Sequence, residues 1–268
     1  EATPLVEALG RRPTLHRTSQ WATFLRNHDE LTLDKLSEAE REEVFAAFGP
    51  EESMQLYGRG LKRRLPPMLD GDPRRLRMAY SLMFSLPGTP AIYYGEEIGM
   101  GEDLAAEGRM AVRTPMQWNA GPAGGFSAAP PRRLIQRPTP DGYSPEHVNV
   151  ADQVRDPDSL WTFMRSLIAA RRECPELGWA PELEVLGQPH RQVLAHCCRG
   201  PEASVVAVHN FGADAVTLDV DLSALGEHAI DLLAHDAVEL ADGRLELSLE
   251  GFGHRWFRVG PPERISVP

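Results

Sequence analysis

The sequence predicts two architectures in one chain, an α/β part at residues 1–178 and an all-β part at residues 179–268. In the first part, helix-like and strand-like runs alternate, which is typical of a parallel sheet or barrel. In the second part, short period-two runs are separated by turn residues, which is typical of an antiparallel β-sandwich. The 268 residues suffice for one large domain or two ordinary ones, and 42% hydrophobic residues can form a sizeable core.

Two short apolar runs in the first part end in polar clusters. Residues 21–26 are predicted to be a strand that leads into Asn-His-Asp-Glu at 27–30, and residues 91–94 are predicted to be a short buried strand that leads into Gly-Glu-Glu at 95–97. In a barrel of parallel strands, catalytic side chains come from the C-terminal ends of the strands. Taken alone, the cluster 27–30 is more typical of a turn or a helix cap, because Asn and Asp favour both.

Helices are predicted at residues 4–10, 37–48, 51–57, 73–86 and 156–173. Ser37 and Glu40 have the spacing of a capping box. The Asp-Pro pairs at 72–73 and 156–157 place an N-cap directly before a proline at the first helical position. Strands of the sandwich are predicted at residues 183–186, 193–196, 204–209, 216–220, 230–233, 245–249 and 255–259.

Residues 98–155 are rich in Gly and Pro and predict a long irregular segment, which in a compact domain is usually functional or a linker. The Lys and Arg side chains at 59–77, including the run 62–64, and at 132–137 are predicted to be surface residues. Glu96 and Glu97 are predicted to order their loop through salt bridges. Three tryptophans are predicted to be core residues rather than exposed ligand-stacking platforms: Trp118, Trp161 and Trp179.

Composition excludes several classes of partner. A formal net charge of -11 argues against nucleic acid and does not favour an anionic membrane surface, whereas a neutral sugar is compatible with it. No apolar run approaches the roughly 20 residues of a membrane span. The three cysteines form neither a disulfide framework nor a metal motif, which predicts a reducing compartment and hence a cytoplasmic location.

Three strings, in order and followed by a β domain, carry a resemblance to a known family. They are Phe-Leu-Arg-Asn-His-Asp-Glu at 24–30, Pro-Gly-Thr-Pro-Ala-Ile-Tyr-Tyr-Gly-Glu-Glu at 87–97 and Arg-Thr-Pro-Met-Gln-Trp at 113–118. Together they resemble the α-amylase superfamily, family 13 of the glycoside hydrolases. The first string resembles the motif at the end of that family's seventh barrel strand, and the second resembles its eighth strand.

Finer features resemble the trehalose synthase (maltose α-D-glucosyltransferase) branch of this family. They are Gln-Trp-Ala at 20–22, Glu-Leu-Thr-Leu at 30–33 and Ile-Gly-Met-Gly-Glu-Asp at 98–103. The resemblance implies the C-terminal part of a (β/α)8 barrel, about its last two βα units, followed by the sandwich. It covers nearly the whole chain and is weakest beyond residue 181.

The resemblance implies roles for four residues. Asp29 corresponds to the third catalytic carboxylate, which binds sugar hydroxyls and stabilises an oxocarbenium-like transition state, and His28 to the residue that hydrogen-bonds the same sugar. Arg109 and Arg113 correspond to arginines that approach the terminal glucose. The family commonly has Gly-Arg-Asp where this chain has Gly108-Arg109-Met110, so Arg109 is expected to lack an ion-pair partner.

Retaining glycoside chemistry also needs a nucleophile and an acid/base carboxylate. The family carries these on its fourth and fifth strands, and a full barrel takes about 250 residues. We therefore expect this chain to be the C-terminal portion of a longer enzyme, inactive alone and prone to oligomerise through faces made for absent neighbours. No cofactor or metal is predicted here, since the ligands of the calcium ion that some family members bind are expected upstream in the complete parent.

The favoured function of the parent is interconversion of maltose and trehalose by a retaining α-glucosyl transfer, with a small α-glucoside as its partner. An α-glucosidase or α-amylase that hydrolyses α-glucosidic bonds shares all the motifs. A third hypothesis, from another class, is a non-catalytic carbohydrate-binding or structural module, in which Asp29 and His28 are only sugar contacts.

Overall fold

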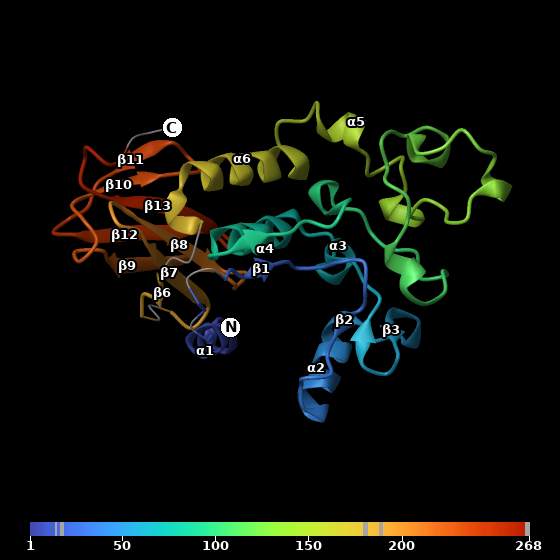
Figure 1. Ribbon diagram of the computed structural model, residues 1–268, viewed down its shortest axis with the longest axis horizontal. Helices are drawn as coiled ribbons and strands as arrows, with labels where there is room; N and C mark the ends of the chain where they lie inside the picture. Colours follow the sequence, from blue (N-terminus) through green and yellow to red (C-terminus); the bar gives the residue numbers. More distant parts are fainter. Residues whose placement is uncertain (14, 17–18, 179–181, 188–189, 266–268) are drawn as a thin grey trace. The chain divides into compact units, whose positions relative to one another are not determined.

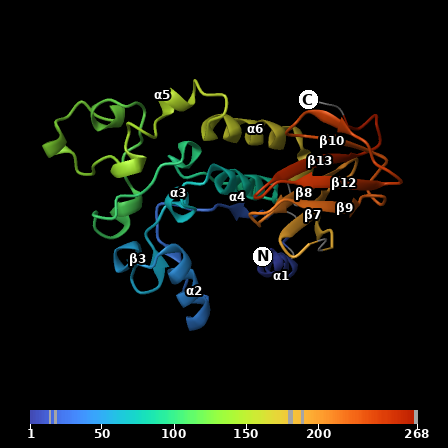
Figure 2. The same cartoon turned by 180° about the vertical axis from the view of Figure 1, so that it is seen from behind.

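The computed structural model describes residues 1–13, 15–16, 19–178, 182–187 and 190–265. The chain forms two compact units, each built from segments that are distant in sequence (Figures 1 and 2). The first unit comprises residues 1–23, 77–91 and 165–268, and the second comprises residues 24–76 and 92–164. The predicted boundary between residues 178 and 179 stays a prediction.

The first unit contains the antiparallel sandwich. Its larger sheet has the strand order β11-β10-β13-β8-β7-β6, and β9 pairs with β12. The bounds are β6 Glu182–Val185, β7 Val193–Arg199, β8 Ser204–Asn210, β9 Val216–Asp221, β10 His228–Asp231, β11 Asp236–Val238, β12 Arg244–Leu249 and β13 His254–Gly260. The sandwich predicted from period-two hydrophobicity is confirmed. The three-residue strand β11 was not predicted, because so short a segment shows no period.

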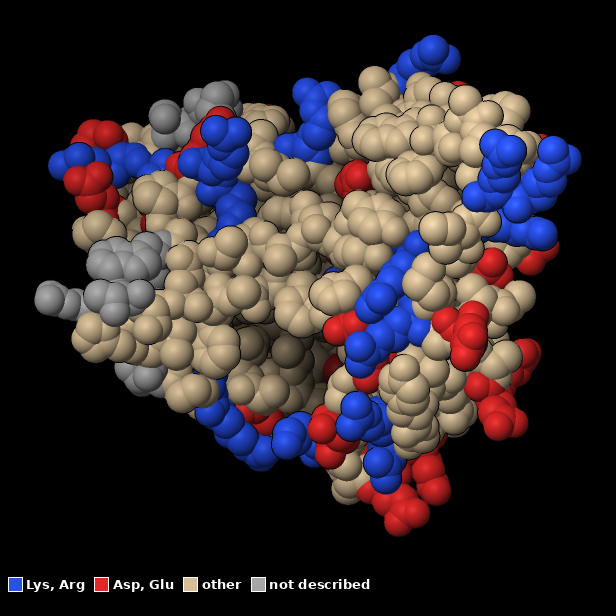
Figure 3. All heavy atoms as spheres, turned by 45° about the vertical axis from the view of Figure 1, so that its right-hand side comes forward, with Lys and Arg blue, Asp and Glu red and all other residues tan. Residues whose placement is uncertain are grey.

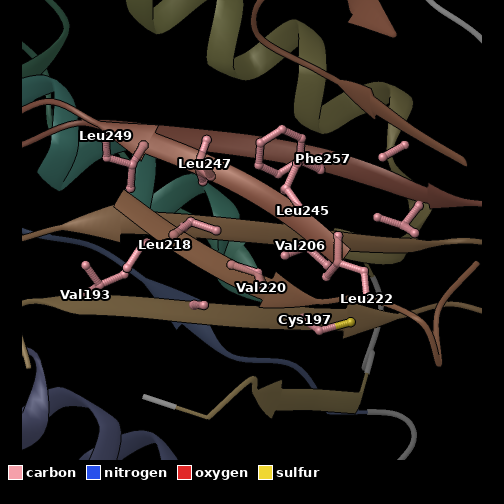
Figure 4. Close-up of a cluster of buried hydrophobic side chains, with 14 residues drawn as sticks. Val193, Cys197, Val206, Leu218, Val220, Leu222, Leu245, Leu247, Leu249 and Phe257 are labelled. Carbon is pink, nitrogen blue, oxygen red and sulfur yellow. The ribbon is translucent and has the colours of Figure 1, made fainter. Parts of the chain in front are cut away.

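The core of the sandwich lies between its two sheets. Side chains alternate between buried and exposed along β9 and β12, so that one face of this pair is apolar. Figure 4 shows this face, with Leu218, Val220 and Leu247, meeting Val206 and Phe257 of the larger sheet. Burial of such side chains contributes about 1.5–3 kcal/mol each, so this cluster is a principal source of stability for the unit.

The central strands β7 and β8 are buried along nearly their whole length, because residues of helix α4 (Pro73–Ser85) pack on their other face. Ser81 joins the two elements, since its Oγ lies 3.0 Å from His209 Nε2 and accepts a hydrogen bond of 2.9 Å from Trp256 Nε1. His196 Nε2 lies 3.2 Å from the Ser85 carbonyl oxygen. The His196, His209 and His254 rings are stacked, with centroids 5.8 and 6.3 Å apart.

Strand β1 (Ala22–Thr23) pairs in parallel with β5 (Thr89–Pro90), as expected for neighbouring barrel strands. A Cβ at Gly88, which has a φ of 118°, would lie 2.5 Å from the Trp21 carbonyl oxygen, so glycine is required for this approach. β1 is shorter than the strand predicted at 21–26, and the strand predicted at 91–94 is wrong, because the pairing residues are 89–90. The remaining helical elements of the unit are α1 (Thr3–Gly10), the C-terminal part of α6 (Leu160–Glu173) and a 3₁₀ turn at Pro175–Leu177.

The second unit contains a small antiparallel sheet with the order β2-β4-β3, formed by Leu31–Thr32, Gly60–Leu61 and Gln55–Leu56. Helix α2 (Glu38–Phe48) precedes its hairpin and has the predicted capping box, in which Ser37 Oγ accepts from Glu40 N at 3.3 Å. The helix predicted at 51–57 is wrong. Only Glu52–Met54 form a 3₁₀ turn, because Tyr57 and Gly58 adopt positive φ and turn the chain from β3 into β4.

Helix α6 begins at Leu160 rather than at residue 156. Asp156 Oδ1 accepts from Asp158 N and forms a local turn, whereas Ser159 Oγ accepts from Thr162 N at 3.1 Å and caps the helix. The prediction of Asp156 as N-cap is therefore wrong. Both residue types favour caps, and the local sequence did not distinguish them.

Residues 98–155 contain only short helical turns, as predicted (Figures 1 and 2). These are the 3₁₀ segments Gly108–Val112, Pro122–Gly125, Pro131–Arg133 and Asp141–Tyr143, and helix α5 (Val150–Gln153). The 3₁₀ segment Glu96–Ile98 ends where the segment begins, and helix α3 (Leu65–Met68) lies earlier in the chain. The buried Gln117 holds distant parts of the segment together. Its Nε2 donates to the carbonyls of Tyr143 and Val148, and its Oε1 accepts from Thr139 N.

Within the described residues, no helix is long and apolar enough to cross a membrane. Cys174, Cys197 and Cys198 are free and buried.

The stacked imidazoles predict an acid-sensitive first unit. Burial lowers the pKa of His196 to about 4 and that of His209 well below its ordinary value. The unfolded chain therefore takes up protons first as the pH falls, and the free energy of unfolding declines between about pH 6.5 and pH 4, by roughly 1–2 kcal/mol per imidazole at pH 5. Hydrogen exchange of the Trp256 indole N–H, which lies beside these rings, measures how the free energy of opening of this region changes with pH.

His209→Gln is expected to reduce the decline, whereas the exposed control His228→Gln leaves it unchanged. Equal pH dependence in both variants would contradict the assignment to the buried rings.

Candidate functional site

The four residues singled out from the sequence come together in the second unit. Asp29 Oδ1 lies 3.0 Å from Arg113 Nη2 and 3.3 Å from Arg109 Nη1. His28 Nε2 lies 3.6 Å from Asp29 Oδ2. The Asp29 side chain is 34% exposed, so a carboxylate held by two guanidinium groups remains open to solvent.

Backbone contacts fix the turn that carries Asp29. Its N–H donates to Asn27 Oδ1 at 2.8 Å, and its carbonyl accepts from Arg26 Nη2 at 2.9 Å. Arg113 Nε donates to the carbonyl of His28 at 2.9 Å, so the arginine that contacts the carboxylate also holds the preceding residue. The turn formed by Asn-His-Asp thus fixes the direction in which the Asp29 carboxylate points.

Arg26 holds this turn through its hydrogen bond to the Asp29 carbonyl. It is buried, its Nε donates to the Arg63 carbonyl at 2.7 Å, and burial lowers its pKa to about 10. Arg64, which is 2% exposed, donates to the carbonyls of Tyr94 and Val112 and lies over the Tyr93 ring at 4.7 Å. The guanidinium groups therefore bind backbone carbonyls from several segments, which fixes those segments relative to one another.

The prediction that the basic run 62–64 lies on the surface is wrong for Arg63 and Arg64. Arg63 Nε donates to Glu102 Oε1, and Glu102 Oε2 accepts from Arg64 N at 2.8 Å. Buried charges of this kind need a partner, and here the partner lies 39 residues further along the chain. Local sequence carried no signal for it.

The expected loss of an ion-pair partner for Arg109 is also wrong. Glu30 replaces the absent aspartate, accepting from Arg109 Nε at 2.6 Å and Nη2 at 3.2 Å. Only 2% of the Glu30 side chain is exposed, and the hydrogen bond from Arg109 lowers the pKa of its carboxyl. A Cβ at Gly60 on β4 would lie 2.8 Å from Glu30 Cγ, so the glycine makes room for this carboxylate.

Glu96 orders its loop by a backbone hydrogen bond rather than by the predicted salt bridge. Its Oε2 accepts from Tyr93 N at 2.8 Å, and burial raises its pKa to about 7. Burial also raises the pKa of Glu97. Within the described residues, neither carboxylate forms an ion pair.

The prediction that three tryptophans are core residues has a different outcome for each. Trp118 is 50% exposed, which contradicts the prediction of a core residue. Trp161 is half-buried and packs against a cluster that contains Ile98 and Met100. Trp179 lies outside the described residues.

The arrangement suits recognition of a neutral polyol. An accessible carboxylate beside an imidazole can accept and exchange hydrogen bonds with sugar hydroxyls. Glu30 is buried and bound by Arg109, so it is not available as the second carboxylate of a retaining pair, whose separation is about 5–5.5 Å. On the face in Figure 3, basic and acidic side chains lie side by side. In the described part of the chain, no group of three or more His, Cys, Asp or Glu side chains is placed to hold a metal ion.

Comparison with known proteins confirms the family resemblance. Residues 62–179 match the family described as alpha amylase, catalytic domain, and residues 203–258 match the sucrose hydrolase-like C-terminal domain. The chain is 36% identical over 264 residues to a trehalose synthase of Thermus thermophilus, covering 98% of this chain and 27% of that protein. It is 34% identical over 271 residues to a trehalose synthase/amylase of Mycobacterium tuberculosis (strain CDC 1551 / Oshkosh), covering 99% and 45%.

Solved structures confirm the fold class. An alpha-amylase from H. orenii has a TM-score of 0.61 at 22% identity, covering 89% of this chain and 39% of that one. The trehalose-6-phosphate hydrolase of Bacillus licheniformis has a TM-score of 0.59 at 19% identity, covering 90% and 43%. The chain therefore combines a partial α-amylase-type barrel with a sandwich domain. Over nearly its whole length the chain is similar to trehalose synthases, in agreement with the resemblance to glycoside hydrolase family 13, and it spans less than half the length of these relatives.

Sequence reasoning missed the supporting residues Glu30, Arg26 and Arg64. Glu30 was visible as a neighbour of Asp29 in the string 27–30, and its acidic character could have suggested a replacement for the missing aspartate. Arg26 and Arg64 gave no such signal, because their partners are backbone carbonyls that any residue supplies.

The Glu30–Arg109 pair gives a testable prediction. Glu30→Gln removes the charged, bidentate acceptor, so the Arg109 side chain is expected to become mobile and its Nε–H to exchange faster with water. Nuclear magnetic resonance of arginine Nε–H groups measures this directly. Glu107→Gln makes the same charge change at an exposed position near Arg109 and is expected to have no effect. An unaltered Arg109 signal in Glu30→Gln would show that other contacts hold this side chain.

Proposed function

We propose that residues 24–30 and 109–113 form the glucose-binding part of an α-glucosyl-transferring active site, with Asp29 as its third carboxylate. The observation that carries the proposal is the placement of Asp29 Oδ1 between Arg109 and Arg113, beside His28. This arrangement fits the roles that the family resemblance implies for all four residues.

Asp29 would accept hydrogen bonds from the hydroxyls of the glucosyl unit. As the glycosidic bond breaks and positive charge develops on the sugar ring, a nearby negative carboxylate stabilises the transition state more than the ground state. The two arginines hold the carboxylate in place, so it does not reorient during the reaction. His28, whose ring lies beside the carboxylate, would bind a hydroxyl of the same sugar.

The nucleophile and the acid/base would come from residues outside this chain. In support of this, the chain covers only 27% and 45% of the length of the two trehalose synthases that it matches. The described barrel strands β1 and β5 form a two-stranded sheet, whereas a closed barrel needs eight strands. We therefore propose that the chain alone does not turn over substrate, and that its parent is an enzyme with a small α-glucoside as substrate.

Interconversion of maltose and trehalose is favoured because the relatives matched over nearly the whole chain are trehalose synthases. An isomerase must hold the freed glucose and exclude water, and residues 98–155 would supply the cover. Hydrolysis by an α-glucosidase or α-amylase remains the second candidate, since the matched family and fold include such enzymes. The cytoplasmic location remains a prediction from the cysteines.

The test uses the product of the whole reading frame that contains residues 1–268, called here the complete protein. Incubated with maltose, it is expected to form trehalose with little free glucose, and Asp29→Asn is expected to lower kcat/KM at least 100-fold by removing a transition-state charge. The 268-residue chain is expected to be inactive. Chromatography of the sugars measures both outcomes.

Asp34→Asn, an exposed carboxylate five residues away, is the matched control and should retain full activity. Release of glucose as the main product would favour the hydrolase. Full activity in Asp29→Asn, or turnover by the 268-residue chain, would contradict the proposal.

A further inference from the structure

Glu96 is a buried carboxylate for which the glucose site, as described above, has no direct use. Only 2% of the residue is exposed, and its Oε2 accepts a hydrogen bond of 2.8 Å from Tyr93 N. Its other oxygen, Oε1, is buried and has no hydrogen-bond partner among the described residues. Keeping an ionisable group in the interior with one oxygen unpaired is costly, because burial disfavours the charged form. A group kept in this state calls for an explanation in terms of function.

The charges around Glu96 are two buried guanidinium groups and one neighbouring carboxylate. Arg26 follows strand β1, Arg64 is the N-cap residue of helix α3, and Glu97 lies on the same 3₁₀ turn as Glu96. Glu96 acts on the arginines without an ion-pair contact, because charges interact over longer distances in the protein interior than in water. Among the carboxylates that raise the pKa of Arg26, Glu96 has the largest effect. Glu96 is therefore the principal counter-charge of Arg26.

Both neighbours of Glu96 lead to the glucose site. Arg26 Nη2 donates to the Asp29 carbonyl at 2.9 Å. The Tyr93 ring lies with its centroid 6.3 Å from that of the His28 imidazole. One buried carboxylate is thus a single residue away from both Asp29 and His28.

The backbone before Glu96 fixes this arrangement. Gly95 has a φ of 86°, and a Cβ at this position would lie 2.5 Å from Met100 Sδ and 3.1 Å from Arg64 Nη1. Glycine therefore allows both the turn and the close approach of the arginine. Because the chain turns here, the Glu96 side chain reaches back to the Tyr93 amide, three residues earlier.

We propose that Glu96 is a positioning residue of the glucose site. Its carboxylate balances the charge of Arg26 and so secures the hydrogen bond to the Asp29 carbonyl. It also holds the Tyr93 amide and so secures the ring that lies beside His28. The inference rests on the proposed function, because this positioning affects catalysis only if Asp29 acts on the sugar.

Protonation of Glu96 removes this counter-charge. Burial raises the pKa of Glu96 to about 7, so the carboxylate is mostly charged above pH 7 and mostly neutral below it. When Glu96 is neutral, Arg26 keeps its buried charge without its principal partner, and its hold on the Asp29 carbonyl weakens. The site is therefore expected to be best ordered on the alkaline side of neutrality.

Glu96→Gln tests the charge without changing the shape of the side chain. The amide oxygen can still accept from Tyr93 N, but the counter-charge is lost. In the complete protein at pH 8, kcat/KM for maltose is expected to fall about 10-fold, mainly through kcat, because Asp29 stabilises the transition state. At pH 6, where Glu96 is mostly protonated, the variant and the unaltered enzyme are expected to agree within about 2-fold. A merely structural role would lower activity equally at both pH values.

Glu97→Gln makes the same change on the adjacent residue and is the matched control. It is expected to retain the fall in activity between pH 8 and pH 6. Because the charge of Glu97 raises the pKa of Glu96, the midpoint of this fall is expected to move to lower pH. An unchanged pH dependence in Glu96→Gln, or its loss in Glu97→Gln, would overturn the proposal.

A second measurement follows the coupling in the 268-residue chain without substrate. The Arg26 Nε–H group, which donates to the Arg63 carbonyl at 2.7 Å, is observed by nuclear magnetic resonance. Its chemical shift is expected to change with a midpoint near pH 7, and Glu96→Gln is expected to abolish this change. The Arg244 Nε–H group, which donates to Asp219 in the sandwich, is the internal control and should stay constant. A constant Arg26 signal, or a change that persists in Glu96→Gln, would contradict the coupling.

The complete protein distinguishes failure of this inference from failure of the proposed function. If Asp29→Asn abolishes maltose turnover but Glu96→Gln keeps the pH dependence of the unaltered enzyme, only the assignment of Glu96 fails. If maltose is not turned over, or Asp29→Asn has no effect, the proposed function fails. The titration of the Arg26 signal then still decides whether Glu96 controls the charge beneath Asp29.

Discussion

Hydrogen bonds from buried guanidinium groups to backbone carbonyls are the constraint on which the second unit depends. Arg26 binds the carbonyls of Asp29 and Arg63, and Arg64 binds those of Tyr94 and Val112. Segments that lack long helices or strands are thereby held at defined positions. Such bonds to a charged donor are about twice as strong as neutral ones, and loss of the arginine would leave the carbonyls unpaired.

These hydrogen bonds also determine the orientation of the Asp29 side chain. With its carbonyl held by Arg26 and its carboxylate by Arg109 and Arg113, the side chain has little freedom, yet it stays accessible. Glu30 fixes Arg109 in turn. Two adjacent acidic residues thus have opposite environments, because one is buried against an arginine and the other lies at the surface. A carboxylate arranged in this way can bind and stabilise, while bond cleavage requires further carboxylates.

Prediction from the sequence succeeded where the physics is local. The capping box at Ser37 and Glu40 needs only a spacing of three residues, and strands β9 and β12 need only alternation of apolar and polar residues. It failed where distant groups decide, as for Arg63 and Arg64, which look like surface residues until Glu102 and the carbonyls are in place. The prediction for Trp118 failed in the opposite sense: it was expected in the core, but a glycine-rich turn leaves its side chain half exposed.

The sequence by itself determined the fold class, the family and the four candidate residues, because motif order and hydrophobic period are properties of neighbours along the chain. Only the tertiary structure decided that these residues meet and that Glu30 takes the place of the missing aspartate beside Arg109. Ion pairs depend on distances between segments tens of residues apart, and those distances exist only once the backbone is folded.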